Sequence, residues 1–277
     1  MIQYLYLGRV AYDEGLRLQS EIAALVAEGR AQNVLLLLEH PPVLTLGRNA
    51  NRSNILASDE LLASRGVTVH EINRGGDVTY HGPGQLVGYP IFDLRTLRTP
   101  SGSRMGPVDF VRGMEEALIR LCGEFGVQAG RIRGLTGVWC HLRWGGASVE
   151  SGGAERKIAA IGIHVARGIT THGFAFNVTT KLEDFQLIVP CGIPDHAVTS
   201  LENEIQPPAE LPSLEAIAHQ AARQFGLVFG EQVLAVESLE ALRAQAARPR
   251  FPAEDTPLQV PSEVERLLGA PDRPTRA

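Results

Sequence analysis

Lysine is scarce in this chain. Of the 26 basic residues among 277, only Lys157 and Lys181 are lysines. A guanidinium stays charged, whereas a lysine can be desolvated, lose its proton and take part in chemistry. Lys157 opens the glycine-punctuated apolar segment KIAAIGIHV (157–165). We therefore single it out as a candidate catalytic residue, with a solvated cation at a strand end as the simpler alternative.

Cysteine and long apolar runs are also rare. The chain has three cysteines, an odd and sparse set, and its start shows no basic segment followed by an apolar one. We expect reduced thiols and a cytoplasmic protein. The longest apolar run, VLLLL at 34–38, is far shorter than the roughly 20 residues that span a membrane. It is predicted to be a buried strand.

Several functional signatures are missing. The net charge of −5 argues against a general nucleic-acid binder. A phosphate-binding G-K-[ST] loop, a G-x-G-x-x-G fingerprint, an H-E-x-x-H zinc motif and a G-x-S-x-G elbow are all absent from the sequence. We expect neither a metal ion nor a bound cofactor.

The hydrophobic patterns predict one α/β domain over residues 1–230 and an extension over 231–277, partly helical and then flexible. Glycine and proline mark the expected boundaries. Helices are predicted over 10–29, 58–65, 107–126 and 213–225, and strands over 2–8, 33–40, 43–48, 67–72, 84–94, 137–144, 157–165 and 171–179.

Two of the cysteines fit packing roles. Cys122 has helical spacing with Leu118 and Phe125, and Cys140 stands in the strand-like GVWCHLRW. Both are expected to be buried thiols.

Cys191 has a different context, between Pro190 and Gly192 in LIVPCGIPDHAVTSL. These neighbours predict a fixed turn with close backbone approach. Asp195 can cap a helix after it, whose N–H groups would stabilise a thiolate. The residues alone leave a catalytic thiol and a buried structural cysteine equally open. A thiolate also needs a base, and Lys157 or His196 can serve.

A glycine-rich loop, NRGGDVTYHGPGQLVGYP, covers residues 73–90. Its glycines permit tight turns and close approach of a ligand to the backbone. Arg74 can bind an anionic group, and Tyr80 and His81 can orient a carbonyl. The alternative is a purely structural hairpin loop.

Five segments, in order, resemble the motifs of the octanoyltransferases of lipoate biosynthesis. They are LLLEHPPVLTLGR, RGGDVTYHGPGQLVGYPI, KIAAIGIHV, THGFAFNV and PCGIPDHAVTSL. The resemblance implies a biotin/lipoate protein ligase-like catalytic domain, α/β (α+β), with a mixed sheet flanked by helices around an acyl channel. It implies octanoyl transfer from octanoyl-acyl carrier protein to the lipoyl-domain lysine of 2-oxoacid dehydrogenases or glycine cleavage H protein, the first step of endogenous protein lipoylation.

The resemblance also assigns roles to residues. It implies that Cys191 carries the acyl group as a thioester and that Lys157 adjusts the pKa of that thiol. The substrate-contacting residues that it implies are Arg74, Gly75, Gly76, Asp77, Val78, Thr79, Tyr80, His81, Ala160, Ile161, Gly162, Gly173, Phe174 and Ala175. The chain departs from the family pattern at Phe176, where leucine is usual, in a longer glycine-rich insert over 144–155, and in the C-terminal extension.

Three other readings compete with the transferase. An ATP-dependent lipoate or biotin ligase would use the strand lysine without needing Cys191. A cysteine hydrolase would pair Cys191 with His81 or His172, and a carrier-protein binder would keep the pocket without catalysis. Acidic protein partners would require a local basic face, for which the candidates are Arg48, Arg74, Arg131, Arg133 and Arg156.

Overall fold

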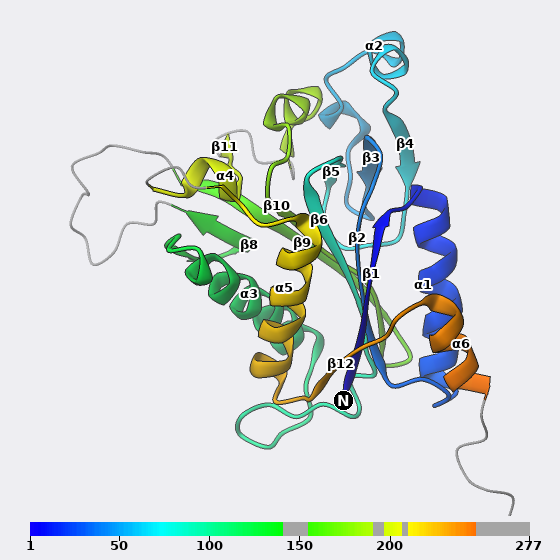
Figure 1. Cartoon of the computed structure of the whole chain (residues 1–277). Coiled ribbons are helices and arrows are strands. Elements are labelled where there is room, and N and C mark those ends of the chain that lie inside the picture. The colour runs from blue at the N-terminus through cyan, green and yellow to red at the C-terminus, as the bar shows by residue number, and fades with distance from the viewer. Residues whose placement is uncertain (141–154, 191–196, 207–209, 248–277) are drawn as a thin grey trace, which may run out of the picture.

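The chain folds around a large mixed β-sheet with helices on both faces (Figure 1). The computed structural model describes residues 1–140, 155–190, 197–206 and 210–247. The strands of the large sheet are β1 (Ile2–Arg9), β2 (Asn33–Glu39), β6 (Gln85–Ile91), β7 (Ala129–Ile132), β8 (Leu135–Cys140), β9 (Arg156–Ala166), β10 (Ile169–Asn177), β11 (Ala197–Val198) and β12 (Val233–Ala235). The predicted α/β class with a mixed sheet is confirmed.

The large sheet mixes parallel and antiparallel pairs. Its order is β12, β1, β2, β6, β10, β9, β8, β7, with β11 beside β9. Strand β1 is parallel to β2 and β12, and β11 is parallel to β9. The pairs from β2 to β7 are antiparallel. The strands predicted around 137–144 and 157–165 correspond to β8 and β9, which pair with each other.

A second, smaller sheet consists of β3 (Val43–Leu46), β4 (Thr68–Glu71) and β5 (Val78–His81), with β3 in the middle. It packs with α2 (Asp59–Ser64) and the 3₁₀ helix η2 (Leu182–Leu187), and the 3₁₀ helix η1 (Arg52–Asn54) leads into α2. Leu44, Tyr80 and Phe185 belong to its own apolar cluster. This small unit forms the upper part of Figure 1.

The apolar run of β2 is explained by helices on both faces of the sheet. Side chains alternate along a strand. Leu35 and Leu37 pack in the cluster that contains α3 (Pro107–Glu124) and α5 (Leu214–Phe229), whereas Leu36 and Leu38 pack with α1 (Tyr12–Ala27). A strand covered on both faces is apolar throughout. In the described ranges, none of the helices is long and apolar enough to cross a membrane.

Local sequence signals set several helix ends. Ser58 accepts a hydrogen bond from the Leu61 N–H and begins α2, as predicted. Pro107 is the first residue of α3, where its missing N–H costs nothing. Gly230 has φ 66° directly after α5, a conformation that favours glycine.

The helix predicted directly after Cys191 is wrong. Asp195, its expected cap, lies outside the described residues, but Ala197 and Val198 form β11, parallel to Arg156 and Lys157 of β9. The helix α4 (Leu201–Glu204) begins only after Ser200, whose hydroxyl accepts from the Asn203 N–H. Pairing with a distant strand overrides the local capping signal.

Residues beyond 230 contribute to the domain. Strand β12 extends the sheet beside β1, and α6 (Leu239–Ala247) places Leu242 in the cluster of α1. Arg243 forms an ion pair with Glu21 of α1 at 2.7 Å. The sequence places a domain boundary at 230–231, but the packed structure continues to Ala247. The rest of the extension, 248–277, lies outside the described residues.

Candidate active site

A pocket of about 210 Å³ lies between the large sheet and the small one, and we call it the central pocket. Its walls come from β9, β10, β6, the β7–β8 turn, the loop before β5 and the first turn of α1. The lining residues are Tyr12, Arg74, Gly75, Gly76, Asp77, Thr79, His81, Val87, Tyr89, Gly134, Leu135, Thr136, Lys157, Ala160, Ile161, Gly162, His172, Gly173, Phe174 and Ala175. Three of the five resembling segments therefore converge on one pocket.

Small residues allow the backbones around the pocket to come close. A Cβ on Gly173 would lie 2.1 Å from the Gly88 carbonyl oxygen, and one on Gly162 would lie 2.6 Å from that of Gly75. The Gly75 N–H donates to the Ile163 carbonyl at 3.0 Å, which holds the loop onto β9. Only glycine fits these positions. The sequence pattern thus fixes how near the loop lies to the strand.

Arg74 anchors this loop from within. Its side chain is buried, and Nη2 donates to the backbone carbonyl of Thr45 at 2.7 Å and to Thr45 Oγ1 at 2.9 Å. Nη1 donates to the Gly75 carbonyl at 3.0 Å. The guanidinium lies at the pocket wall as a fixed, buried positive charge, which favours an anionic or strongly polar group in the pocket.

His81 is held neutral by its surroundings. Burial, followed by the nearby charges of His40 and Arg74, lowers the pKa of His81 to about 3. Its Nδ1 lies 2.8 Å from Gln85 Oε1, so Nδ1–H is the donor. Gln85 in turn donates to Asn177 Oδ1 at 2.9 Å. His81 can therefore orient a substrate but does not carry a charge near neutral pH.

Lys157 lies at one end of the central pocket and is 8% exposed. Its Nζ is 4.6 Å from the centroid of the buried Trp139 ring, a cation–π contact that fixes where the amine stands. Gly137 also packs on this side chain, because a Cβ there would lie 3.4 Å from Lys157 Cε. Lys157 is therefore buried and is not a solvated cation at a strand end.

The described residues on either side of Cys191 in the chain lie beside Lys157. Cys191 itself, with Gly192 and His196, lies outside the described residues. Pro190, which directly precedes it, lines a small cavity together with Lys157, Thr79 and Ala160. After Cys191 in the chain, the Thr199 N–H donates to the Lys157 carbonyl at 2.9 Å. Both flanks of the Cys191 segment therefore end beside Lys157.

Two residues of the predicted substrate stretch do not line the central pocket. Val78 and Tyr80 point into the core of the small sheet, since side chains alternate along β5. The Tyr80 hydroxyl donates to Asp184 Oδ2 at 2.9 Å, and burial and this carboxylate raise the pKa of Tyr80. Phe176 likewise packs in the core beneath the sheet and is not a pocket residue.

The pocket also contains residues that the substrate stretches did not include. Tyr12 and Tyr89 enter from α1 and β6, and Thr136 enters from the start of β8. The Tyr89 hydroxyl lies 2.6 Å from His40 Nε2, and burial raises the pKa of Tyr89 well above its usual range. Tyrosines on a helix and a strand carry no local functional signal, so only the folded structure could identify them.

The sequence suggests only one role for His172, as the partner of Cys191 in a cysteine hydrolase. It lines the central pocket with φ 56°, and its Nε2 lies 2.7 Å from Asn73 Oδ1. Burial and the Arg74 charge lower the pKa of His172 to about 4. Within the described ranges, no group of three or more His, Cys, Asp or Glu side chains is arranged to hold a metal ion.

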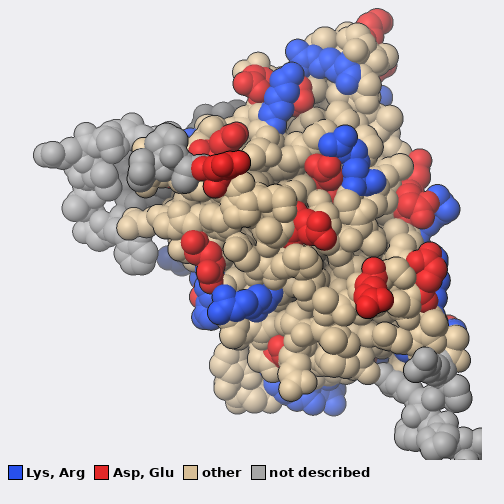
Figure 2. Space-filling model, viewed as in Figure 1, with Lys and Arg blue, Asp and Glu red and all other residues tan. Residues whose placement is uncertain are grey.

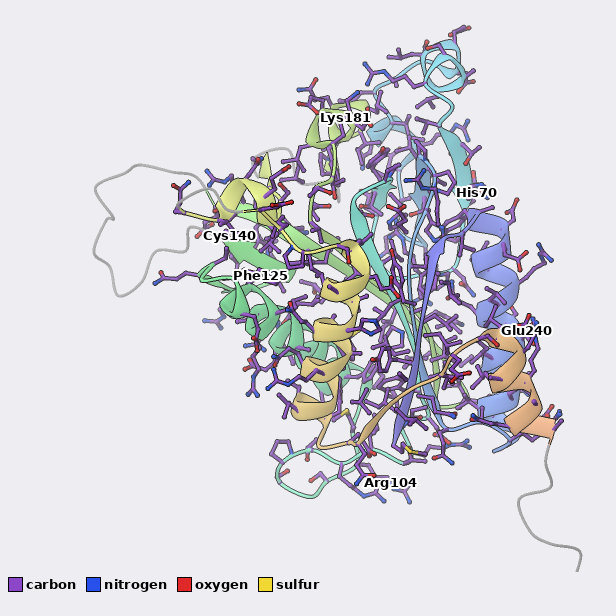
Figure 3. All side chains as sticks on the ribbon, viewed as in Figure 1. His70, Arg104, Phe125, Cys140, Lys181 and Glu240 are labelled. Atoms are coloured by element: carbon purple, nitrogen blue, oxygen red, sulfur yellow. The ribbon has the colours of Figure 1, made fainter. Side chains whose placement is uncertain are left out.

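The other two cysteines are packing residues, as predicted. Cys122 and Cys140 are free thiols with exposures of 0% and 1%. Burial raises the pKa of Cys140 to about 12. Figure 3 shows Cys140 on β8.

Most of the candidate arginines of a basic face are engaged elsewhere. Arg74 is buried, Arg131 pairs with Glu115 and Glu116, and Arg156 pairs with Glu204. Acidic and basic side chains are interspersed on the face shown in Figure 2. Arg48 and Arg133 are exposed and form no ion pair with any residue that the structure describes.

The sequence comparison identifies the family. Residues 11–226 match the family described as lipoyl protein ligase A/B catalytic domain. The match covers most of the chain and contains every residue assigned to the site. The chain therefore belongs to this family.

Similar proteins include octanoyltransferases from several organisms. One from Acidobacterium capsulatum is 60% identical over 239 residues, 86% of this chain and 94% of that protein. Another from Koribacter versatilis is 48% identical and covers 96% of this chain and 97% of that protein. Among solved structures, the bipartite lipoate protein ligase of Thermoplasma acidophilum superposes with a TM-score of 0.63 at 16% identity, covering 89% of this chain and 91% of that one. That likeness confirms the predicted ligase-like fold.

Proposed function

We propose that this chain is an acyltransferase that moves an octanoyl group from octanoyl-acyl carrier protein to the lysine of a lipoyl domain. The identity to octanoyltransferases over nearly their whole length supports the reaction. The observation in the fold that supports it is that the buried Lys157 lines the central pocket and lies beside Pro190 and Thr199, which flank Cys191 in the chain. We expect the reaction to take place in the cytoplasm, where thiols stay reduced.

The proposed chemistry has two halves. Lys157 accepts the proton of the Cys191 thiol, and the thiolate attacks the donor carbonyl to form an octanoyl thioester. The proton then passes to the departing thiolate of the donor. In the second half, the acceptor amine attacks this thioester and gives up one proton to Lys157, an amide forms, and Cys191 leaves as a thiolate. Thioester exchange is nearly neutral in free energy and amide formation is downhill, so ATP is not required.

The central pocket suits the acyl group in this scheme. Ala160, Gly162 and Ala175 leave room along the sheet, and Val87 and Tyr89 supply apolar surface. We place the octanoyl chain here, with the carbonyl near Lys157. Backbone N–H groups near Gly76, which also lines the pocket, would face the developing oxyanion.

The acceptors would be the lipoyl domains of 2-oxoacid dehydrogenases and the glycine cleavage H protein. An ATP-dependent ligase is the rival reading on the same fold. Incubation of the chain with octanoyl-acyl carrier protein and a lipoyl domain separates the two. We expect octanoylated lipoyl domain without ATP, and none from octanoate plus ATP. A requirement for ATP would contradict the transferase, and release of free octanoate without acceptor product would favour the hydrolase.

A further inference from the structure

A second concavity adjoins the central pocket at the open side of β9, and we call it the edge groove. It has a volume of about 510 Å³ and shares five lining residues with the central pocket: Gly75, Gly76, Thr136, Ile161 and Gly162. The rest of its lining comes from the first turns of α3, the far half of β9 and Arg48: Pro107, Val108, Val111, Arg112, Ile163, His164 and Val165. The two spaces therefore adjoin each other at the loop of Gly75 and Gly76.

The edge groove lies beside a part of β9 that has no neighbouring described strand on this side. The pairing of β8 with β9 ends at Ala159, and beyond it no described strand lies on that side of β9. The Ile163 carbonyl points to this edge, where it accepts from the Gly75 N–H. The two-residue alternation of a strand directs the backbone groups of Ile161 and Val165 to the same edge. An extended chain that carries amides can pair with such an edge.

The charge of the edge groove is positive. Its lining contains Arg48 and Arg112 and no acidic residue. Arg112 pairs with Glu115 on its own helix, at 2.6 Å. Arg48 is exposed and forms no ion pair among the residues described here, and its backbone N–H donates to the Arg74 carbonyl at 3.0 Å, which ties it to the pocket loop. An anionic group at the outer end of the groove would meet the Arg48 guanidinium.

We infer that the edge groove binds the 4′-phosphopantetheine arm of the donor, with Arg48 against its phosphate, an inference that rests on the proposed function. With the acyl chain in the central pocket and its carbonyl near Lys157, the thiol side of the donor must leave through a space that adjoins that pocket. The arm is an extended chain with two amides and a terminal phosphate. Lys157 and Ile163, which lines the groove, are six residues apart, about 20 Å along a strand, so an extended arm whose thioester lies near Lys157 would reach the groove.

The test measures binding without turnover. Dissociation constants of free 4′-phosphopantetheine and of pantetheine are measured by calorimetry for the full chain. We expect the phosphorylated arm to bind about five- to tenfold more tightly, because one charge-assisted contact at an exposed site has this size. Arg48→Ala removes this preference and Arg48→Lys restores part of it. Arg17→Ala, on the exposed face of α1 outside both pockets, leaves it unchanged.

A second variant keeps the test valid if an Arg48 variant misfolds. Val108 is 72% exposed on the first turn of α3, where an acidic residue favours the helix. Val108→Glu should therefore fold normally and weaken the binding of 4′-phosphopantetheine more than that of pantetheine. Equal affinities of the two arms for the unaltered chain would overturn the inference. Preserved preference in a chain that transfers no octanoyl group would instead contradict the proposed function alone.

The phosphopantetheine arm is shared by acyl carrier protein and coenzyme A. The transfer rates from the two octanoyl thioesters distinguish these sources of the arm. We expect Arg48→Ala to lower kcat/KM by a similar factor for the carrier-protein donor and the coenzyme A donor, since both contain this phosphate. A loss confined to the carrier-protein donor would show that Arg48 contacts the protein surface and would overturn the phosphate assignment.

Discussion

At the scale of single residues, the site depends on a few side chains whose surroundings are fixed. Lys157 is buried against Trp139, and Arg74 and His81 are held by hydrogen bonds to Thr45 and Gln85. These contacts determine where a proton acceptor, a positive charge and a neutral imidazole stand around the central pocket. Each can be altered without touching the others.

Replacing Lys157 with arginine tests its role as a proton acceptor. The variant keeps the positive charge but cannot accept a proton, so we expect octanoyl transfer to fall by about 10²- to 10⁴-fold. Single-turnover rates from octanoyl-acyl carrier protein measure the loss. Lys181→Arg is the matched control, because this only other lysine is exposed next to η2 (Figure 3) and should transfer normally. Transfer at a near-normal rate in Lys157→Arg would exclude the acid–base role.

Buried neutral histidines should make the protein sensitive to acid. Burial lowers the pKa of His40 to about 4, against an unfolded value near 6.5. Between these two values the unfolded chain binds more protons, so stability is complete above pH 6.5 and is lost as the pH falls toward 4. At pH 5 this one residue accounts for about 2 kcal/mol of lost stability.

Urea unfolding at pH 7 and pH 5 measures this effect. His40→Gln should lose about 2 kcal/mol less than the unaltered chain between the two pH values. His219→Gln, at an exposed position on α5, should leave the pH dependence as it is. An unchanged pH dependence in His40→Gln would show that this imidazole is not held neutral.

At the scale of elements, β9 is the backbone of the site. It carries Lys157 at one end, small residues at the pocket in the middle and an open edge beyond Ala159. The loop at Gly75 rests directly on it. The close fit of loop and strand makes the geometry of the pocket sensitive to a single added methyl group.

Gly162→Ala tests that close fit. The new Cβ would lie 2.6 Å from the Gly75 carbonyl, so the loop that carries Arg74 must move. We expect a loss of about 1–3 kcal/mol in stability and a raised KM for the acyl donor. Gly123→Ala in α3 is the control, because nothing lies within 4 Å of its added Cβ and a helical alanine is favourable. Unfolding curves and steady-state kinetics that match the unaltered chain for Gly162→Ala would contradict the tight contact.

Elements with a strong hydrophobic periodicity could be predicted from the sequence, and contacts between distant segments could not. The apolar run of β2 and the patterns of α3 and α5 follow from burial on one or both faces, which sequence displays directly. The glycines and Arg74 of the 73–90 loop likewise predict a ligand pocket directly from the sequence. Tyr12 and Tyr89 could not be predicted as pocket residues, since they meet only when α1 packs on the sheet. The prediction of a helix directly after Cys191 was wrong because β11 pairs with β9, which is distant along the chain.

At the scale of the whole molecule, the last described residues stabilise the catalytic domain. Leu242 is 1% exposed and Ala246 3% exposed in the cluster beside α1. Arg30 also donates to the Ala246 carbonyl at 3.2 Å. The segment 233–247 therefore completes one face of the sheet.

Two truncations test this role. A chain that ends at Gly230 should have a clearly lower Tm, because it loses β12, α6 and their buried contacts. A chain that ends at Ala247 should keep the Tm of the full protein, since the sequence predicts little core in 248–277. Leu242→Ala should cost about 2–5 kcal/mol by itself. Equal Tm values for the two truncations would contradict the contribution of α6.

In the proposed reaction, Cys191 beside Lys157 carries the acyl group between donor and acceptor. The most direct measurement is the intact mass of the chain after mixing with octanoyl-acyl carrier protein, without ATP and without acceptor. We predict the added mass of one octanoyl group, present in Cys122→Ala and absent in Cys191→Ser, and discharged when a lipoyl domain is added. An adduct that survives in Cys191→Ser, or an unmodified chain that still octanoylates the lipoyl domain, would contradict the account.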